Sequence, residues 1–161
     1  DTNPEPVPAP VPAASADERR LREAVELARR CPPSTTAFSV GAVITGEDGE
    51  VLATGWSREA DPRAHAEEAA LAKLSPVDER LTRATLYSSL EPCSRRASRP
   101  LSCTRLILAA RVPRVVFAWR EPSLFVDCEG AEILRGAGVE VIEMPHLAPL
   151  ARAANAHLLG G

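Results

Sequence analysis

The chain has 161 residues, of which 45% are apolar and 25% charged, with a formal net charge of −3. This length suits one folded domain, and the acidic balance with only three Phe, two Trp and one Tyr argues against a nucleic-acid-binding protein, which usually presents a basic face or stacking rings. No apolar run approaches the roughly 20 residues that span a bilayer, and the opening residues lack the apolar core of a signal peptide, so we expect a cytoplasmic protein with no membrane partner.

The first 14 residues are rich in proline, which occupies positions 4, 6, 8, 10 and 12. Alternating prolines remove backbone donors and favour an extended polyproline conformation. We therefore expect a disordered leader over residues 1–14 and one folded domain over residues 15–161. Ser15 and Glu18 have the spacing of a capping box, and the apolar stripe that follows predicts a helix that ends at Cys31 and the two prolines after it.

The remaining segments alternate between strand and helix patterns. Residues 38–45 and 50–56 are predicted to pair as a hairpin around a turn at residues 47–49. Further strands are predicted over residues 84–90, 114–119 and 138–143, and helices over residues 65–74, 103–111, 131–136 and 147–159. A hairpin followed by alternating helices and strands predicts an α/β fold, a three-layer α/β/α sandwich around a mixed five-stranded sheet.

The candidate chemistry lies in three short motifs: H-A-E at residues 65–67, E-P-C at residues 91–93, and Cys103. One imidazole and two thiolates can hold zinc tetrahedrally while leaving the fourth position to water, which is the arrangement of a catalytic zinc site. Glu67 follows His65 by two residues, so its carboxylate can reach the vicinity of the metal without binding it and can exchange protons with that water. The sequence therefore predicts an open zinc site with a carboxylate beside it.

These motifs resemble the signature of the zinc-dependent cytidine-deaminase-like superfamily, H-x-E followed by P-C and a second cysteine. Residues 39–44, 84–93 and 136–141 also fall in the order and spacing of one branch, the pyrimidine deaminase of riboflavin biosynthesis, and the similarity covers residues 17–158. The resemblance implies that His65, Cys93 and Cys103 bind a Zn²⁺ cofactor and that Glu67 is the general acid/base. It also implies a homodimer or a larger homo-oligomer.

The function implied by the resemblance is hydrolytic deamination. A ring amino group of a small pyrimidine-type substrate, phosphoribosylated in the riboflavin branch, would become a carbonyl with release of ammonia. Candidate substrate contacts are Phe38, Arg95 and Arg99; the two arginines lie in the loop between the cysteines, and a guanidinium fork suits a phosphate. The branch usually carries Asn-Pro where this chain has Ala37 and Phe38.

Other functions stay open at this point. A deaminase of another pyrimidine or purine-like base, nucleoside or nucleotide in secondary metabolism would need the same four residues. A non-catalytic zinc-stabilised domain that binds a partner, through the proline-rich leader, would account for Ala37 and Phe38. Deamination of RNA or single-stranded DNA is disfavoured by the negative charge and the few aromatic residues. We expect a small-molecule substrate and no nucleic-acid partner.

Overall fold

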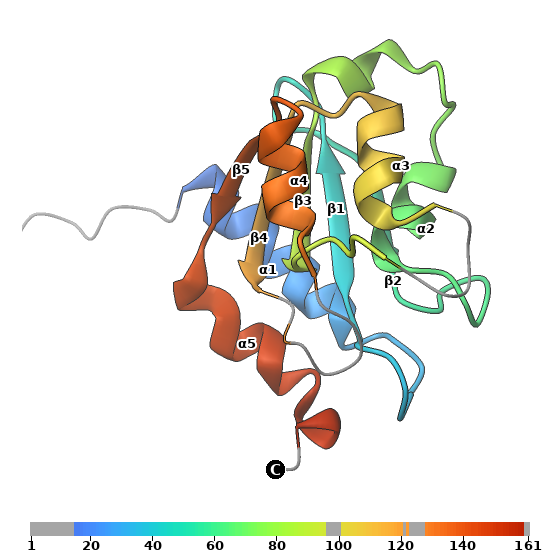
Figure 1. Cartoon of the computed structure of the whole chain (residues 1–161), viewed down its shortest axis with the longest axis vertical. Helices are drawn as coiled ribbons and strands as arrows, with labels where there is room; N and C mark the ends of the chain where they lie inside the picture. The colour runs from blue at the N-terminus through green and yellow to red at the C-terminus, as the bar shows by residue number, and fades with distance from the viewer. Residues whose placement is uncertain (1–14, 96–100, 121, 123–127, 160–161) are drawn as a thin grey trace, which may run out of the picture.

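The computed structural model describes residues 15–95, 101–120, 122 and 128–159. The leader expected over residues 1–14 and the candidate substrate contact Arg99 lie outside these ranges. Within them a mixed five-stranded sheet has the order β2-β1-β3-β4-β5 (Figure 1). Its strands are β1 (Gly41–Thr45), β2 (Val51–Trp56), β3 (Thr85–Leu90), β4 (Arg114–Trp119) and β5 (Glu140–Glu143). β1 runs antiparallel to both β2 and β3, whereas β3, β4 and β5 are parallel.

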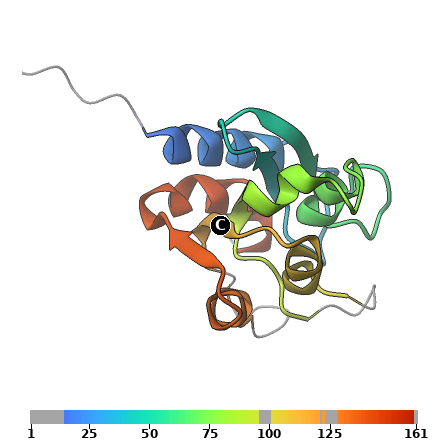
Figure 2. The ribbon, with the colours of Figure 1, turned by 90° about the horizontal axis from the view of Figure 1, so that it is seen from above.

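Helices cover both faces of the sheet. Two of those in the described ranges, α1 (Ala16–Ala28) and α5 (Ala148–Ala153), pack on one face, mainly against β1, β3 and β4. On the other face lie α2 (Ala66–Ala72), α3 (Cys103–Ala110) and α4 (Gly130–Gly136), as the view from above shows (Figure 2). This arrangement confirms the three-layer α/β/α prediction for the described part of the chain.

The core lies between these layers, and two glycines let helices approach the sheet closely. Val43, Leu86 and Val116 of the central strands are fully buried. A Cβ on Gly41 would collide with the backbone of α1, and one on Gly55 would collide with the backbone of α2. Because neither glycine carries a side chain, α1 can lie directly on β1 and α2 directly on β2.

The first predicted strand begins later than expected, at Gly41 instead of residue 38. The backbone amides just before and at this point are bound by side chains. Ser39 N donates to Asn155 Oδ1 at 2.6 Å, Val40 N donates to Ser57 Oγ at 2.9 Å, and Gly41 N donates to Ser89 Oγ at 3.1 Å. Residues 38–40 are buried, but they lie outside the strand.

The closing helix predicted over residues 147–159 was wrong as a single element. The structure has a 3₁₀ turn (Pro145–Leu147), the short helix α5, and a second 3₁₀ turn (Ala156–Leu158). Asn155 separates the last two, and its side-chain amide donates to Ser39 O at 3.0 Å and Ala151 O at 3.1 Å. No helix within the described ranges is both long enough and apolar enough to cross a membrane.

Candidate metal centre and active site

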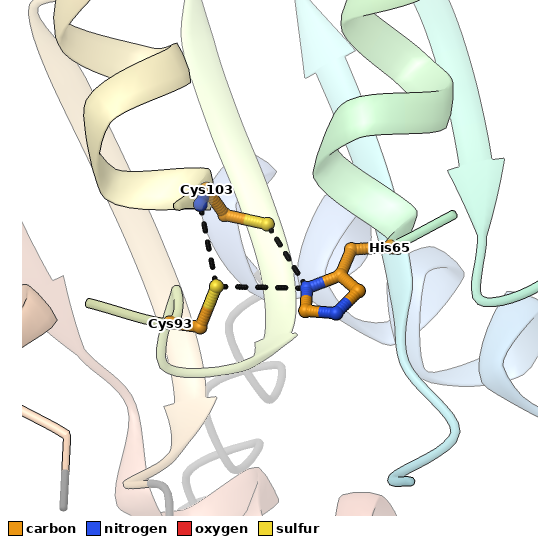
Figure 3. Close-up of side chains that lie close together, drawn as sticks. All are labelled: His65, Cys93 and Cys103. Carbon is orange, nitrogen blue, oxygen red and sulfur yellow. Dashed lines mark hydrogen bonds between the residues drawn. The ribbon is translucent and has the colours of Figure 1, made fainter. Parts of the chain in front are cut away.

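His65, Cys93 and Cys103 come from separate segments that meet beyond the C-terminal end of β3. His65 is the extended residue that precedes α2, Cys93 lies three residues after β3, and Cys103 is the first residue of α3. Figure 3 shows the three side chains pointing toward one another. The structure therefore brings together all three residues that the sequence motifs singled out, although up to 38 positions separate them along the chain.

The spacing of these side chains fits a tetrahedral zinc ion. His65 Nδ1 lies 3.5 Å from Cys93 Sγ and 3.3 Å from Cys103 Sγ, and the three candidate ligand atoms all lie within 4.8 Å of one another. Zinc bonds of about 2.3 Å to sulfur and about 2.0 Å to nitrogen place two tetrahedral ligands about 3.5 Å apart. One imidazole and two sulfurs are also the donor types that zinc prefers, so the residues present fit this metal.

The loop that carries Cys93 is held by the first turn of α3. Cys103 N donates to Cys93 Sγ at 3.2 Å, while Thr104 donates to Cys93 O from its backbone amide at 3.1 Å and from Oγ1 at 2.8 Å. The hydroxyl of Ser102 caps the same helix by accepting from Arg105 N. The N-terminus of a helix favours negative charge, so this placement stabilises a thiolate on Cys93.

The two thiols share a hydrogen bond, and their pKa values move in opposite directions. The bond from Cys103, helped by His65, lowers the pKa of Cys93. The same bond, together with burial, raises the pKa of Cys103. One thiol of the pair therefore ionises readily while the other keeps its proton, and a bound cation would be needed to hold both as thiolates.

Glu67 lies in the first turn of α2 and is only 3% exposed. Burial is the main cause that raises the pKa of this carboxyl, against the opposing effect of hydrogen bonds from Cys103 and Ser88. Ser88 Oγ donates to Glu67 Oε1 at 2.8 Å. A desolvated carboxyl with a raised pKa, next to a candidate metal site, can both accept and return a proton.

The candidate substrate contacts Phe38 and Arg95 do not belong to the group of three candidate ligands. Phe38 is buried, and its ring packs edge-on against Trp119 with centroids 5.5 Å apart. Arg95 is exposed, two residues after Cys93. Arg99 lies outside the described residues, so the arginine pair stays a prediction.

The sequence did not predict the supporting contacts that Glu68, Glu91 and Gly130 make around the site. Glu68 Oε1 accepts a hydrogen bond from His65 N at 3.2 Å and so fixes the start of α2; an acidic residue three positions after a helix cap was the signal for it. Glu91 is only 2% exposed and accepts from Ala131 N in α4 at 3.0 Å. Gly130 packs against the Pro92 carbonyl with no room for a Cβ. The contacts of Glu91 and Gly130 are long-range, and no local motif announces them.

Comparison with known proteins places the chain in a family. Residues 14–119 match the model of the cytidine and deoxycytidylate deaminase zinc-binding region. The chain is 43% identical over 129 residues to a diaminohydroxyphosphoribosylamino-pyrimidine deaminase of Schizosaccharomyces pombe, an alignment that covers 78% of this chain and 31% of that protein. The chain thus spans about a third of the length of this curated relative.

Solved structures agree with the fold. RibD of Acinetobacter baumannii superposes with a TM-score of 0.77 at 31% identity, over 90% of this chain and 39% of that one. A C-terminal deletion mutant of the Rib2 deaminase of Aspergillus oryzae, at 23% identity, shares the fold with a TM-score of 0.68 over 89% of this chain and 100% of that one. With the family model matching well over half of its residues, the chain belongs to the cytidine and deoxycytidylate deaminase family and contains its zinc-binding region.

Proposed function

We propose that this chain is a zinc-dependent hydrolytic deaminase that converts a ring amino group of a phosphoribosylated diaminopyrimidine to a carbonyl and releases ammonia. The observation that carries the proposal is the convergence of His65, Cys93 and Cys103 within 4.8 Å, next to the buried Glu67. The substrate class is supported by the 43% identity to a protein named as a diaminohydroxyphosphoribosylamino-pyrimidine deaminase.

His65 Nδ1, Cys93 Sγ and Cys103 Sγ would hold the metal in this proposal. A zinc ion bound by three protein ligands supplies Lewis acidity that makes water nucleophilic near neutral pH. The buried thiols exclude bulk water from one side of the centre, and the backbone amide at the N-terminus of α3 donates to Cys93 Sγ and stabilises its negative charge.

Glu67 moves the protons of the reaction. Its carboxylate accepts the proton that water loses as the oxygen attacks the ring carbon, and delivers it to the adjacent ring nitrogen. A second proton passes through the same carboxyl to the departing amino group, the C–N bond breaks, and ammonia leaves as the carbonyl forms. Overall, one water is consumed for each ammonia released. The raised pKa of Glu67 suits a group that must take up and return protons within one turnover.

We also propose the bounds of the domain, its substrate contacts, its oligomeric state and its compartment. Residues 15–161 form the deaminase domain, Phe38, Arg95 and Arg99 contact the substrate and its phosphate, and the protein assembles as a homo-oligomer. Because two reduced cysteines must stay available as ligands, a reducing compartment such as the cytoplasm suits the site.

Ammonia release from a panel of substrates tests this function. The zinc-loaded chain is assayed with the phosphoribosylated diaminopyrimidine, its dephosphorylated form, deoxycytidylate, cytidine and adenosine. We expect turnover of the phosphoribosylated compound, with a higher KM or no turnover after the phosphate is removed. Turnover of a different member of the panel would reject the substrate class. Failure of the zinc-loaded chain on the whole panel would favour a non-catalytic, zinc-stabilised domain.

A further inference from the structure

Ser88 of β3 is completely buried, and its hydroxyl lies between two oxygen atoms. Ser88 Oγ is 2.8 Å from Glu67 Oε1 and 2.7 Å from the backbone carbonyl of Leu90. Both distances are those of good hydroxyl hydrogen bonds, and the single hydroxyl proton serves one oxygen at a time: when it goes to the Leu90 carbonyl, Ser88 Oγ can accept the proton of a protonated Glu67. The Leu90 carbonyl belongs to the end of the strand that leads through two residues to Cys93. Ser88 thus connects the carboxyl of Glu67 on α2 to the backbone that carries a candidate zinc ligand.

The other side chains that affect the Glu67 carboxyl belong to the candidate metal centre. Cys103 forms a hydrogen bond with Glu67, and His65 and Cys93 act on it electrostatically. A cysteine that binds zinc does so as a thiolate and has no proton to donate. Among the hydrogen-bond partners that the structure shows for Glu67, Ser88 is therefore the one that metal binding leaves in place, whichever of the two carries the shared proton.

We propose that Ser88 is a positioning residue for Glu67, a proposal that rests on the deaminase function proposed above. Its hydroxyl holds Oε1 of the carboxyl against β3 and so leaves Oε2 to exchange protons with water and the substrate. The bond restricts rotation of a buried carboxyl, and in an active site a misplacement of about 1 Å can cost about 100-fold in rate. Ser88 itself contacts neither the substrate nor the metal in this role.

The neighbouring residue offers a matched control. Ser89 is also buried, at 1% exposed, and its hydroxyl accepts a hydrogen bond from Gly41 N of β1 at 3.1 Å, whereas the Ser88 hydroxyl contacts two oxygens. Ser88→Ala and Ser89→Ala therefore remove the same atom from adjacent positions of the same strand. Only the first change removes a partner of Glu67.

Steady-state kinetics of these two variants, each with its zinc content and Tm measured, test the role. We expect Ser88→Ala to lower kcat by about tenfold or more with KM within about twofold of the wild type and an unchanged zinc content. Ser89→Ala should keep kcat within about twofold of the wild type, even if its Tm falls by as much as the Tm of Ser88→Ala. Equal kcat values for the two variants, or a loss in Ser88→Ala that appears only in KM, would overturn the proposal.

A crystal structure of zinc-loaded Ser88→Ala supplies a readout that does not depend on turnover. We expect the Glu67 carboxyl to rotate away from its position in the wild type or to occupy more than one conformer, whereas Ser89→Ala leaves it in place. An unmoved, single carboxyl in Ser88→Ala would reject the positioning role. If the wild-type chain proves to deaminate nothing, the proposed function fails, while the carboxyl position still decides whether Ser88 holds Glu67.

Discussion

Glu67 and Asp17 are carboxylates packed on opposite faces of one sheet, and their pKa values shift in opposite directions. Asp17, in the first turn of α1, accepts two hydrogen bonds from the Arg114 guanidinium at 2.8 and 2.6 Å and one from the Tyr87 hydroxyl at 2.6 Å. The hydrogen bonds to Arg114 are the main cause that lowers the pKa of Asp17. Glu67 has no such partner in the described structure, and burial raises its pKa.

The opposite pKa shifts of Asp17 and Glu67 suit the two carboxyl groups to different roles. A carboxylate fixed by a permanent guanidinium charge keeps its ionised form and joins distant segments, here α1 to the start of β4. A carboxyl buried beside a hydroxyl and thiols has no guanidinium bonded to it to hold it ionised, so its proton stays exchangeable. The first arrangement stabilises the fold, and the second suits catalysis. The variants below should separate these roles.

Glu67→Gln should have the largest effect on activity. Removing a general acid/base typically costs 10²- to 10⁴-fold, so we expect kcat to fall about 1,000-fold. The Tm should not fall, because the variant replaces a desolvated carboxyl with a neutral amide of the same shape. Glu68→Gln is the control, since its amide oxygen can still accept the bond from His65 N and activity should stay within about threefold. Comparable losses in both variants would contradict the assignment of Glu67.

Asp17→Asn should lower the stability of the fold and leave kcat unchanged, the reverse of Glu67→Gln. The change removes the charge that pairs with Arg114, and we expect about 2 kcal/mol less stability, or about 6 °C in Tm, with kcat unchanged. Glu23→Gln on the same helix removes an exposed partner of Arg20 and should cost well under 1 kcal/mol. Thermal unfolding and ammonia release, measured on the same samples, check both. A tenfold loss of kcat in Asp17→Asn at assay temperature would break the separation of roles.

Gly130→Ala tests how closely α4 packs against the candidate metal loop. The new Cβ would collide with the Pro92 carbonyl, and backbone must move to admit it. We expect a loss of about 2 kcal/mol and weaker zinc retention against a chelator, because Cys93 follows Pro92. Gly136→Ala, at the other end of the same helix, meets open space and should be neutral or slightly stabilising. Unchanged zinc retention in Gly130→Ala would show that the loop adapts without moving Cys93.

Lowering the pH should remove the contribution of Asp17 to the free energy of unfolding. Because its folded-state pKa lies below the ordinary value of 3.8, its contribution is complete above that value and is lost as the pH falls through the lowered pKa. The difference in stability between wild type and Asp17→Asn should therefore shrink by about 1 kcal/mol between pH 5 and pH 3. Denaturant unfolding at several pH values measures it. A difference that widens on acidification would mean that the pKa of Asp17 is not lowered.

The order of strands and helices could be predicted because the hydrophobic patterns are local. The strand over residues 114–119 was predicted with its observed bounds, and the sheet was predicted as mixed. The closing helix failed as one element because the Asn155 side chain binds the backbone of Ser39, 116 positions away. No pattern around residue 155 reveals a partner so distant.

In the candidate site too, some residues could be predicted from local sequence motifs, and others are identified only by their tertiary contacts. His65, Glu67, Cys93 and Cys103 stand out because zinc chemistry requires those residue types in a recognisable order. The residues that support them depend on tertiary contacts: Ser88 contacts Glu67 across 21 positions and Glu91 contacts Ala131 across 40. A serine in a strand and a glutamate before a proline have many ordinary roles, so only the folded structure gives them this one.

Zinc stoichiometry decides whether His65, Cys93 and Cys103 form a metal site. The wild-type chain, Cys103→Ala and Cys31→Ala are purified without chelator, and the metal in each is measured by mass spectrometry against protein concentration. We predict about one zinc per chain in the wild type and in Cys31→Ala, whose thiol donates to Val40 O and does not belong to the group of three candidate ligands, and almost none in Cys103→Ala. A wild-type chain that contains no zinc, or a Cys103→Ala variant that retains it fully, would show that these three residues do not form the zinc site.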